Sequence, residues 1–238
     1  VEFKKIKSMG WILDKRPNNR DGGIGNTFED LLGVDENNLK DPDFESFEVK
    51  TQRQVTTSYI TLFSRVPSYP KGVNKYLKDH YGEARDKNFP ELNKLYASLF
   101  GNRWSKVYEK QNMRLRTDKN KVFLEVADLN HNLLERDIYW DFEDLEKASK
   151  KLNDIWVIYA KNKKEDGNRY YKYVNSDIYL DFDFSKFISS IDCGEIMFDL
   201  RMGVHKSGKY YGKPHDHGSG FRIKGENMKN IYSSSISI

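Results

Sequence analysis

The stretch that decides the fold is DPDFESFEVKT, residues 41–51. Its last part, FEVKT, alternates apolar and polar side chains, which is typical of a β-strand with one buried face. In such a strand Val49 faces one side, whereas Glu48 and Lys50 face the other. Another acid, Asp43, precedes the pair, which gives the pattern Asp-x(n)-Glu-x-Lys. The pattern allows two interpretations, a solvated strand face or a metal-dependent site that cuts phosphodiesters.

The second interpretation has a definite chemistry. Mg²⁺ prefers oxygen ligands and usually takes one or two carboxylates together with water and phosphate oxygens. Asp43 and Glu48 can supply the carboxylates, with the backbone carbonyl of Val49 as a further ligand. Lys50, on the same side as Glu48, can orient or deprotonate the attacking water and offset negative charge in the transition state. The Glu-x-Lys spacing also occurs at residues 2–4, but without an upstream acid or an alternating pattern.

Composition narrows the class of protein. The chain has 238 residues, enough for one large domain or two lobes around a cleft. Its 40 basic and 36 acidic side chains give a net charge of +4, which neither establishes nor excludes a nucleic-acid partner. The single cysteine, Cys193, excludes a disulfide framework and fits a reducing cytoplasm. Because no apolar run approaches roughly 20 residues, we expect no membrane span.

The remaining sequence predicts a mixed α/β fold. We expect a helix at 26–32, a strand at 56–65 that forms a hairpin with the strand around Val49, and a helix at 90–101 between Pro90 and Gly101. Other expected elements are a helix at 73–80, a strand at 121–128, a helix at 142–154, a strand at 155–160, and further strands from 169 onward. Because the composition shifts near residue 165 from mixed α/β to strands with loops, we expect a second lobe to begin there, with the two lobes at 1–165 and 166–238.

Glu29 lies on the helix expected just before the strand. One interpretation is an acid near the helix N-terminus that complements the helix dipole. The other is an additional carboxylate that a neighbouring helix brings to the metal cluster. The sequence alone leaves both open.

A second group of polar residues lies in GKPHDHGSGFRI, residues 212–223. His215, Asp216 and His217 stand on a glycine-flanked stretch that makes a poor zinc site, because no cysteine or third histidine is adjacent in sequence. They can instead read base edges, or be ordinary turn residues. The neighbouring residues that belong to the same candidate DNA-binding group are Arg201, His205, Lys209 and Arg222.

The basic segment PSYPKGVNKYLKDHYG interleaves lysines with tyrosines. Lys75 and Lys78 suit contacts with DNA phosphates. The segment is equally compatible with a solvated helix whose tyrosines pack inward.

Taken in order, GIGNTFEDLL, DPDFESFEVKT, ITLFSR and DLRMGVHKSGKYYGKPHDHGSGFRI resemble the MutH/MvaI/BcnI group of DNA endonucleases, over roughly residues 10–230. The resemblance implies a PD-(D/E)XK nuclease core, a mixed sheet flanked by helices, with a β-rich C-terminal lobe that closes on duplex DNA. It implies that Asp43, Glu48 and Lys50 are catalytic and that Glu29 is the family's helix acid. It also implies that the His-Asp-His block, Arg201 and Arg222 contact bases.

The implied function is that of a type II restriction endonuclease, which hydrolyses both strands of duplex DNA with Mg²⁺ and leaves 5′-phosphate ends. Because the family includes enzymes that act as monomers, we expect a monomer. One branch of the family carries a histidine where this chain has Ser64, so the resemblance favours sites of the type CC(A/T)GG. Two rivals remain, a MutH-like mismatch-repair nicking enzyme and a DNA-binding module without catalysis.

Overall fold

The computed structural model describes residues 2–16, 22–33, 46–54 and 59–238. The chain folds into two compact units, each assembled from separate segments of sequence. Unit 1 comprises Val1–Ile60, Lys150–Asp183 and Lys224–Ile238, and unit 2 comprises Thr61–Ser149 and Phe184–Ile223.

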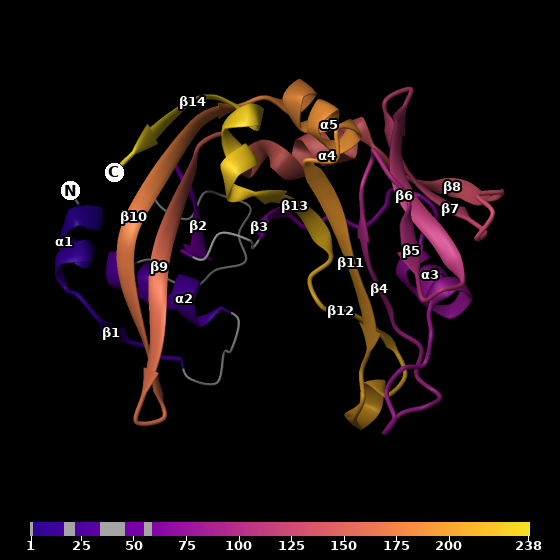
Figure 1. The fold of residues 1–238 in the computed structure, drawn as a ribbon, viewed down its shortest axis with the longest axis horizontal. Coiled ribbons are helices and arrows are strands. Elements are labelled where there is room, and N and C mark those ends of the chain that lie inside the picture. Colours follow the sequence, from indigo (N-terminus) through magenta and orange to yellow (C-terminus); the bar gives the residue numbers. More distant parts are fainter. Residues whose placement is uncertain (1, 17–21, 34–45, 55–58) are drawn as a thin grey trace. The chain divides into compact units, whose positions relative to one another are not determined.

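Unit 1 is built on a mixed sheet whose strands follow the order β1-β10-β9-β2, with β14 paired to the other part of β10. Its elements are α1 (Glu2–Ser8), β1 (Ile12–Leu13), α2 (Gly23–Leu32), β2 (Glu48–Arg53), the 3₁₀ helix η1 (Lys150–Leu152), β9 (Ile155–Glu165), β10 (Asn168–Phe182), the 3₁₀ helix η3 (Gly225–Ile231) and β14 (Tyr232–Ser237). The long strands β9 and β10 form an antiparallel hairpin, visible in Figure 1. Strand β2 runs parallel to β9, with Val49 opposite Trp156 and Lys50 opposite Val157.

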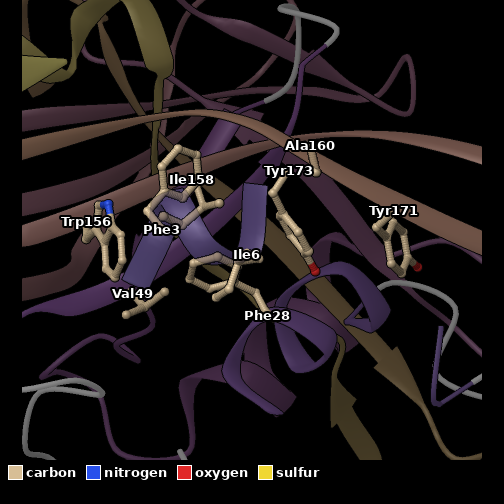
Figure 2. Packing of buried hydrophobic residues seen from close by; sticks show 9 residues of the cluster. All are labelled: Phe3, Ile6, Phe28, Val49, Trp156, Ile158, Ala160, Tyr171 and Tyr173. Atoms are coloured by element: carbon tan, nitrogen blue, oxygen red, sulfur yellow. The ribbon is translucent and has the colours of Figure 1, made fainter. Parts of the chain in front are cut away.

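The core of unit 1 explains why β2 alternates. Val49 lies in a buried cluster with Phe28 of α2 and with Trp156, Ile158 and further side chains of β9 and β10. Figure 2 shows this cluster, in which aromatic rings from helix and sheet meet edge to face. Helix α2 therefore covers the Val49 face of the sheet. Glu48 and Lys50 consequently project from the opposite face.

Unit 2 contains two further sheets. Its elements are β3 (Tyr59–Phe63, which begins in unit 1), α3 (Val73–Tyr81), β4 (Leu95–Leu99), β5 (Ser105–Val107), β6 (Gln111–Asp118), β7 (Lys121–Ala127), β8 (Leu133–Asp141), α4 (Phe142–Ser149), α5 (Phe184–Asp192), β11 (Ile196–Val204), the 3₁₀ helix η2 (Gly208–Tyr210), β12 (Pro214–Asp216) and β13 (Gly220–Lys224). One sheet has the order β12-β11-β13-β3, with β4 paired to the other side of β11, and the other has the order β5-β6-β7-β8.

The mixed α/β fold class is confirmed, but one expected element and one expected strand pairing are wrong. The segment expected as a helix at 90–101 forms strand β4, because Leu95 and Leu99 are buried while the strand pairs with β11. Within the described residues, the segment expected to form a hairpin with β2 becomes β3, which joins the sheet of β11 and β13 instead. Pairing with β11 outweighs the local helix preference of the first segment, whereas the second keeps its strand conformation and differs only in its partner.

The two units meet along the sequence after residues 60, 149, 183 and 223, and not near residue 165, where the composition shift predicted a boundary. That residue ends β9, and the hairpin to β10 keeps both strands in unit 1. The last segment of the chain returns to unit 1 with η3 and β14. The helices and strands expected at 73–80, 121–128, 142–154 and 155–160 are present, with ends shifted by a few residues, although the third is shorter and ends in η1. No helix in the described part of the chain has the length and apolarity to cross a membrane.

Candidate functional site

Strand β2 in unit 1 carries the first group of predicted residues. Glu48 and Lys50 share one face of the strand, and the Lys50 ammonium donates a hydrogen bond to Glu48 Oε1. The backbone N–H of Glu48 donates to the carbonyl of Asp154, at 3.0 Å, which fixes the start of the strand against the turn before β9. The side chain of Val49 is buried on the other face, so only its backbone is available to a ligand on this side.

The Glu48 carboxylate is buried, with 1% of the residue exposed. A second cation, Lys151 of η1, reaches the same oxygen, with 2.7 Å between Nζ and Oε1. The other oxygen, Oε2, is buried and accepts no hydrogen bond from any described residue. Because a buried carboxylate oxygen without a partner is costly, the site is suited to a cation at Oε2. The pKa of the nearby Tyr232 is raised. Burial is the largest cause, and the negative charges of the Asp154 and Glu48 carboxylates add to it.

Glu29 belongs to a different face of the sheet. It lies on α2 next to Phe28, which packs in the core on the Val49 side. A Cβ on Gly25 of the same helix would lie 3.1 Å from Thr51 Oγ1, so α2 approaches β2 from that side. Glu29 is also one of the acids that, after burial, raise the pKa of the core residue Tyr173. The structure thus brings Glu48 and Lys50 together but places Glu29 across the sheet.

Asp43, the remaining predicted carboxylate, lies outside the described residues. Within the part of the chain that is described, no group of three His, Cys, Asp or Glu side chains could hold a metal ion. A metal site at Glu48 therefore needs a ligand from beyond this part, such as Asp43, or from backbone and phosphate oxygens.

Unit 2 carries the second group of predicted residues, on β11 and β13. Arg201 Nε donates to Asp199 Oδ2 at 2.7 Å, and Arg222 Nε lies 3.2 Å from the same oxygen. Asp199 is buried, at 8% exposure, whereas the Arg201 side chain is 46% exposed. Arg222 also donates from a terminal nitrogen to the carbonyl of Gly218, at 2.9 Å. The structure thus holds the two arginines together by one buried acid.

The histidines form a row beside them. The ring centroids of His205 and His215 are 4.4 Å apart, and those of His215 and His217 are 4.5 Å apart. The row depends on Gly203, because a Cβ there would lie 2.4 Å from His217 Nε2. Asp216 Oδ1 accepts hydrogen bonds from the backbone of the following turn, from Gly218 at 2.9 Å and Ser219 at 2.6 Å. Asp216 therefore shapes the turn, as the plainer interpretation of the sequence predicted for this stretch.

The predicted phosphate-binding lysines differ in exposure. Lys75 is exposed and lies 2.7 Å from Asp79, whereas Lys78 is buried at 7% exposure and paired with the same acid. Lys209 is exposed on η2, with its ammonium 4.9 Å from the ring centroid of Tyr210. Lys75 and Lys209 are therefore more accessible to a phosphate than Lys78.

Sequence reasoning missed three residues that the structure adds. Lys151 reaches Glu48 from a segment remote in sequence. Asp199 stands two residues before Arg201 and repeats the spacing of Glu48 and Lys50, a signal that the sequence offered. Tyr96, in register with Arg201 and edge-on to His217, lies in the segment predicted to be helical.

Comparison with known proteins identifies the family of this chain. The sequence model of the MvaI/BcnI restriction endonuclease family matches residues 1–232. The solved structure of a restriction endonuclease MvaI–cognate DNA substrate complex is 34% identical, with a TM-score of 0.88, over 99% of this chain and 95% of that one. The structure of restriction endonuclease MvaI in the absence of DNA is 35% identical, with a TM-score of 0.64, over 100% and 96%. The comparison with curated proteins found no match. The chain therefore belongs to the MvaI/BcnI restriction endonuclease family of type II site-specific nucleases.

Proposed function

We propose that this protein hydrolyses both strands of duplex DNA at sites of the type CC(A/T)GG, with Mg²⁺ and with Asp43, Glu48 and Lys50 as the catalytic residues. It acts as a monomer in the prokaryotic cytoplasm and leaves 5′-phosphate ends. The observation that carries the proposal is the buried Glu48 Oε2, which accepts no hydrogen bond from the described residues and lies on the carboxylate that Lys50 contacts.

The residues that would hold Mg²⁺ are Asp43 and Glu48, with the backbone carbonyl of Val49. When bound, the ion polarises the scissile phosphate and lowers the pKa of a coordinated water. Lys50 binds Glu48 and is 24% exposed, so its ammonium can orient a water for attack and offset charge on the phosphate. Glu29, on the other face of the sheet, is assigned no direct role in this chemistry.

Recognition is assigned to unit 2. Arg201 and Arg222 donate to guanines, and His215, Asp216 and His217 complete the readout, with His205 in the same row. Lys75 and Lys209 contact phosphates, and Lys78 supports the helix that carries Lys75. The support for this assignment is the arrangement itself. Arg201 and Arg222, on the paired strands β11 and β13, meet the buried Asp199, and the three histidines form a row of their own.

The test is digestion of a plasmid of known sequence with Mg²⁺, followed by mapping of the ends. We expect double-strand cuts at one sequence with 5′-phosphates. Duplexes that are unmethylated, hemimethylated or fully methylated, analysed on a denaturing gel, identify a nicking enzyme by cleavage of one strand only. Binding without cleavage would instead identify a silent DNA-binding module.

Two variants connect the result to the proposed residues. Asp43→Ala and Glu48→Ala should abolish cleavage and leave sequence-specific binding, because the carboxylates serve the chemistry and the base contacts lie elsewhere. Binding can even tighten, since a negative charge near phosphate is removed. Cleavage at the wild-type rate by either variant would disprove the assignment.

A further inference from the structure

Glu48 is contacted by two ammonium groups at once, although a single buried carboxylate carries only one negative charge. Lys50, on the same strand, and Lys151, on η1, both meet Oε1. Their side chains are 24% and 31% exposed, so both ammonium groups retain some contact with solvent. The opposite oxygen, Oε2, has no partner among the described residues. Two positive charges from different elements therefore share one buried carboxylate, and both act on the same oxygen.

The backbone fixes Lys151 in this position. The next residue, Leu152, is fully buried, and its carbonyl accepts a hydrogen bond from the buried Tyr232 hydroxyl at 3.0 Å. Asn153 accepts from the backbone of Phe182, at 3.0 Å. Lys150, one residue earlier in the same 3₁₀ helix, is exposed. The helix therefore presents one lysine to Glu48 and leaves its neighbour at the surface.

A divalent cation at Glu48 has to be bound in the presence of these two positive charges. Unit charges a few ångströms apart interact strongly near a partly buried site, and a doubly charged ion feels twice the repulsion. Lys50 is required on chemical grounds, because it is the lysine of the catalytic pattern. Lys151 lies outside that pattern, so its charge needs a separate explanation.

We propose that Lys151 is a counter-charge that neutralises Glu48 in the metal-free protein and competes with the divalent ion for it. The proposal rests on the proposed function, since it requires that Glu48 binds metal. Lys151 stabilises the fold while the site is empty of metal, and it raises the metal concentration at which the enzyme becomes active. It is a positioning residue, which acts on the metal through Glu48.

The test compares Lys151→Met with Lys150→Met, which removes an equal charge one residue away on the exposed side of the same helix. Binding of Mn²⁺ to DNA-free protein is measured by electron paramagnetic resonance of the free ion. We expect Lys151→Met to bind Mn²⁺ about tenfold more tightly than wild type, because the repulsion is relieved. Lys150→Met should bind as wild type does, and Lys151→Arg, which keeps the charge, should restore the wild-type affinity.

Thermal unfolding supplies a second measurement that does not depend on cleavage. Without divalent ions Lys151→Met should melt below wild type, because Glu48 has lost a counter-charge. Mn²⁺ should then raise its melting temperature by more than it raises that of wild type. If Lys151→Met does not fold, Lys151→Gln, which keeps the stem and a polar head, replaces it in both measurements.

Cleavage separates this role from a purely structural one. In Lys151→Met the Mg²⁺ concentration for half-maximal cleavage should fall, while the maximal single-turnover rate changes less. Wild-type or weaker Mn²⁺ affinity in Lys151→Met and Lys151→Gln would overturn the inference. Glu48→Gln distinguishes the two proposals. If wild type binds Mn²⁺ and Glu48→Gln does not, the metal site stands whatever Lys151 does. If Glu48→Gln binds as wild type does, the metal site at Glu48 fails, and the inference fails with it.

Discussion

The two units carry the same short pattern, an acid followed two residues later by a base on one strand. In β2 the pair is Glu48 and Lys50, and in β11 it is Asp199 and Arg201. In both, the acid is buried, the base is more exposed, and a second cation from another element reaches the same acid oxygen. The two units therefore share the same arrangement of one buried acid and two cations, although the proposed roles are catalysis in one unit and recognition in the other.

The difference lies in the cation. An ammonium is a compact, strongly hydrated point charge, so Lys50 and Lys151 act on Glu48 through charge, and a metal ion can compete with them. A guanidinium is a planar fork with five donors. Arg201 can therefore give its Nε to Asp199 and still present its terminal nitrogens to a base edge. An acid that pairs with lysines suits a metal site, whereas an acid that pairs with arginines suits a rigid reader of guanine.

The largest expected effect tests the β2 pair. Lys50→Ala should lower the single-turnover cleavage rate by about 10³-fold, because the charge that orients water and offsets the phosphate is lost. Affinity for the cognate duplex, measured in Ca²⁺, should stay close to wild type. The control is Lys4→Ala, which removes the exposed lysine of the other Glu-x-Lys sequence, on α1, and should cut normally. Full activity in Lys50→Ala would show that Lys50 has no role in catalysis and is an ordinary polar residue of β2.

The next effect tests the β11 pair. Arg201→Ala and Arg222→Ala should each cost about 1–3 kcal/mol of binding free energy and relax preference at one base pair. The measurement is a panel of duplexes, each with one base pair changed, at two salt concentrations. Lys75→Ala is the comparison, since loss of a phosphate contact weakens binding on every duplex and flattens the salt dependence. If Arg222→Ala lowers the binding affinity equally for all duplexes, Arg222 contacts the DNA backbone rather than a base.

A smaller effect tests the shared acid of unit 2. Asp199→Asn keeps the shape of the side chain but removes the charge that holds Arg201 and Arg222. We expect a loss of about 1 kcal/mol on the cognate duplex and weaker discrimination at the two base pairs that the arginines are proposed to read. Combined with Arg201→Ala, it should cost less than the sum of the two single changes, because Asp199 acts through Arg201. Strict additivity would mean that Asp199 only stabilises the strand.

The comparison also explains what the sequence could predict. Alternation around Val49 and the helix at 73–80 are local signals, and both elements formed. The segment at 90–101 has helix-forming residues and a proline start, yet it pairs with β11, because a sheet edge of unit 2 was available to it. Lys151 and the Asp199–Arg222 contact arise only when remote segments meet, so no spacing rule could have identified them. The sequence predicted that Glu48 and Lys50 share one strand face, but it did not predict the remote residues that pair with the buried acids.

The smallest expected effect concerns the pH dependence of stability, in which the two units differ because all five histidines of the chain lie in unit 2. Partial burial contributes most to the lowered pKa of His217. The nearby His215 comes next, Lys206 and His205 contribute further, and Asp216 opposes them. The pKa of this histidine in the folded protein lies below its ordinary value of 6.5. Above pH 6.5 the imidazole is mostly neutral in both the folded and the unfolded chain, so it does not reduce the free energy of unfolding there. As the pH falls below this value, the unfolded chain takes up the proton first and the free energy of unfolding decreases.

His217→Asn should therefore flatten the decrease in stability as the pH falls below 6.5, measured by urea unfolding. The effect is small because the residue is exposed, and solvent screens its charge. His131→Asn, at the exposed turn between β7 and β8, is the matched control, since asparagine tolerates the positive φ of 65° there. If the pH dependence of the free energy of unfolding is the same in His217→Asn as in wild type, protonation of His217 does not affect stability. A steeper profile would mean that His217 gains a proton on folding, the opposite of what its surroundings require.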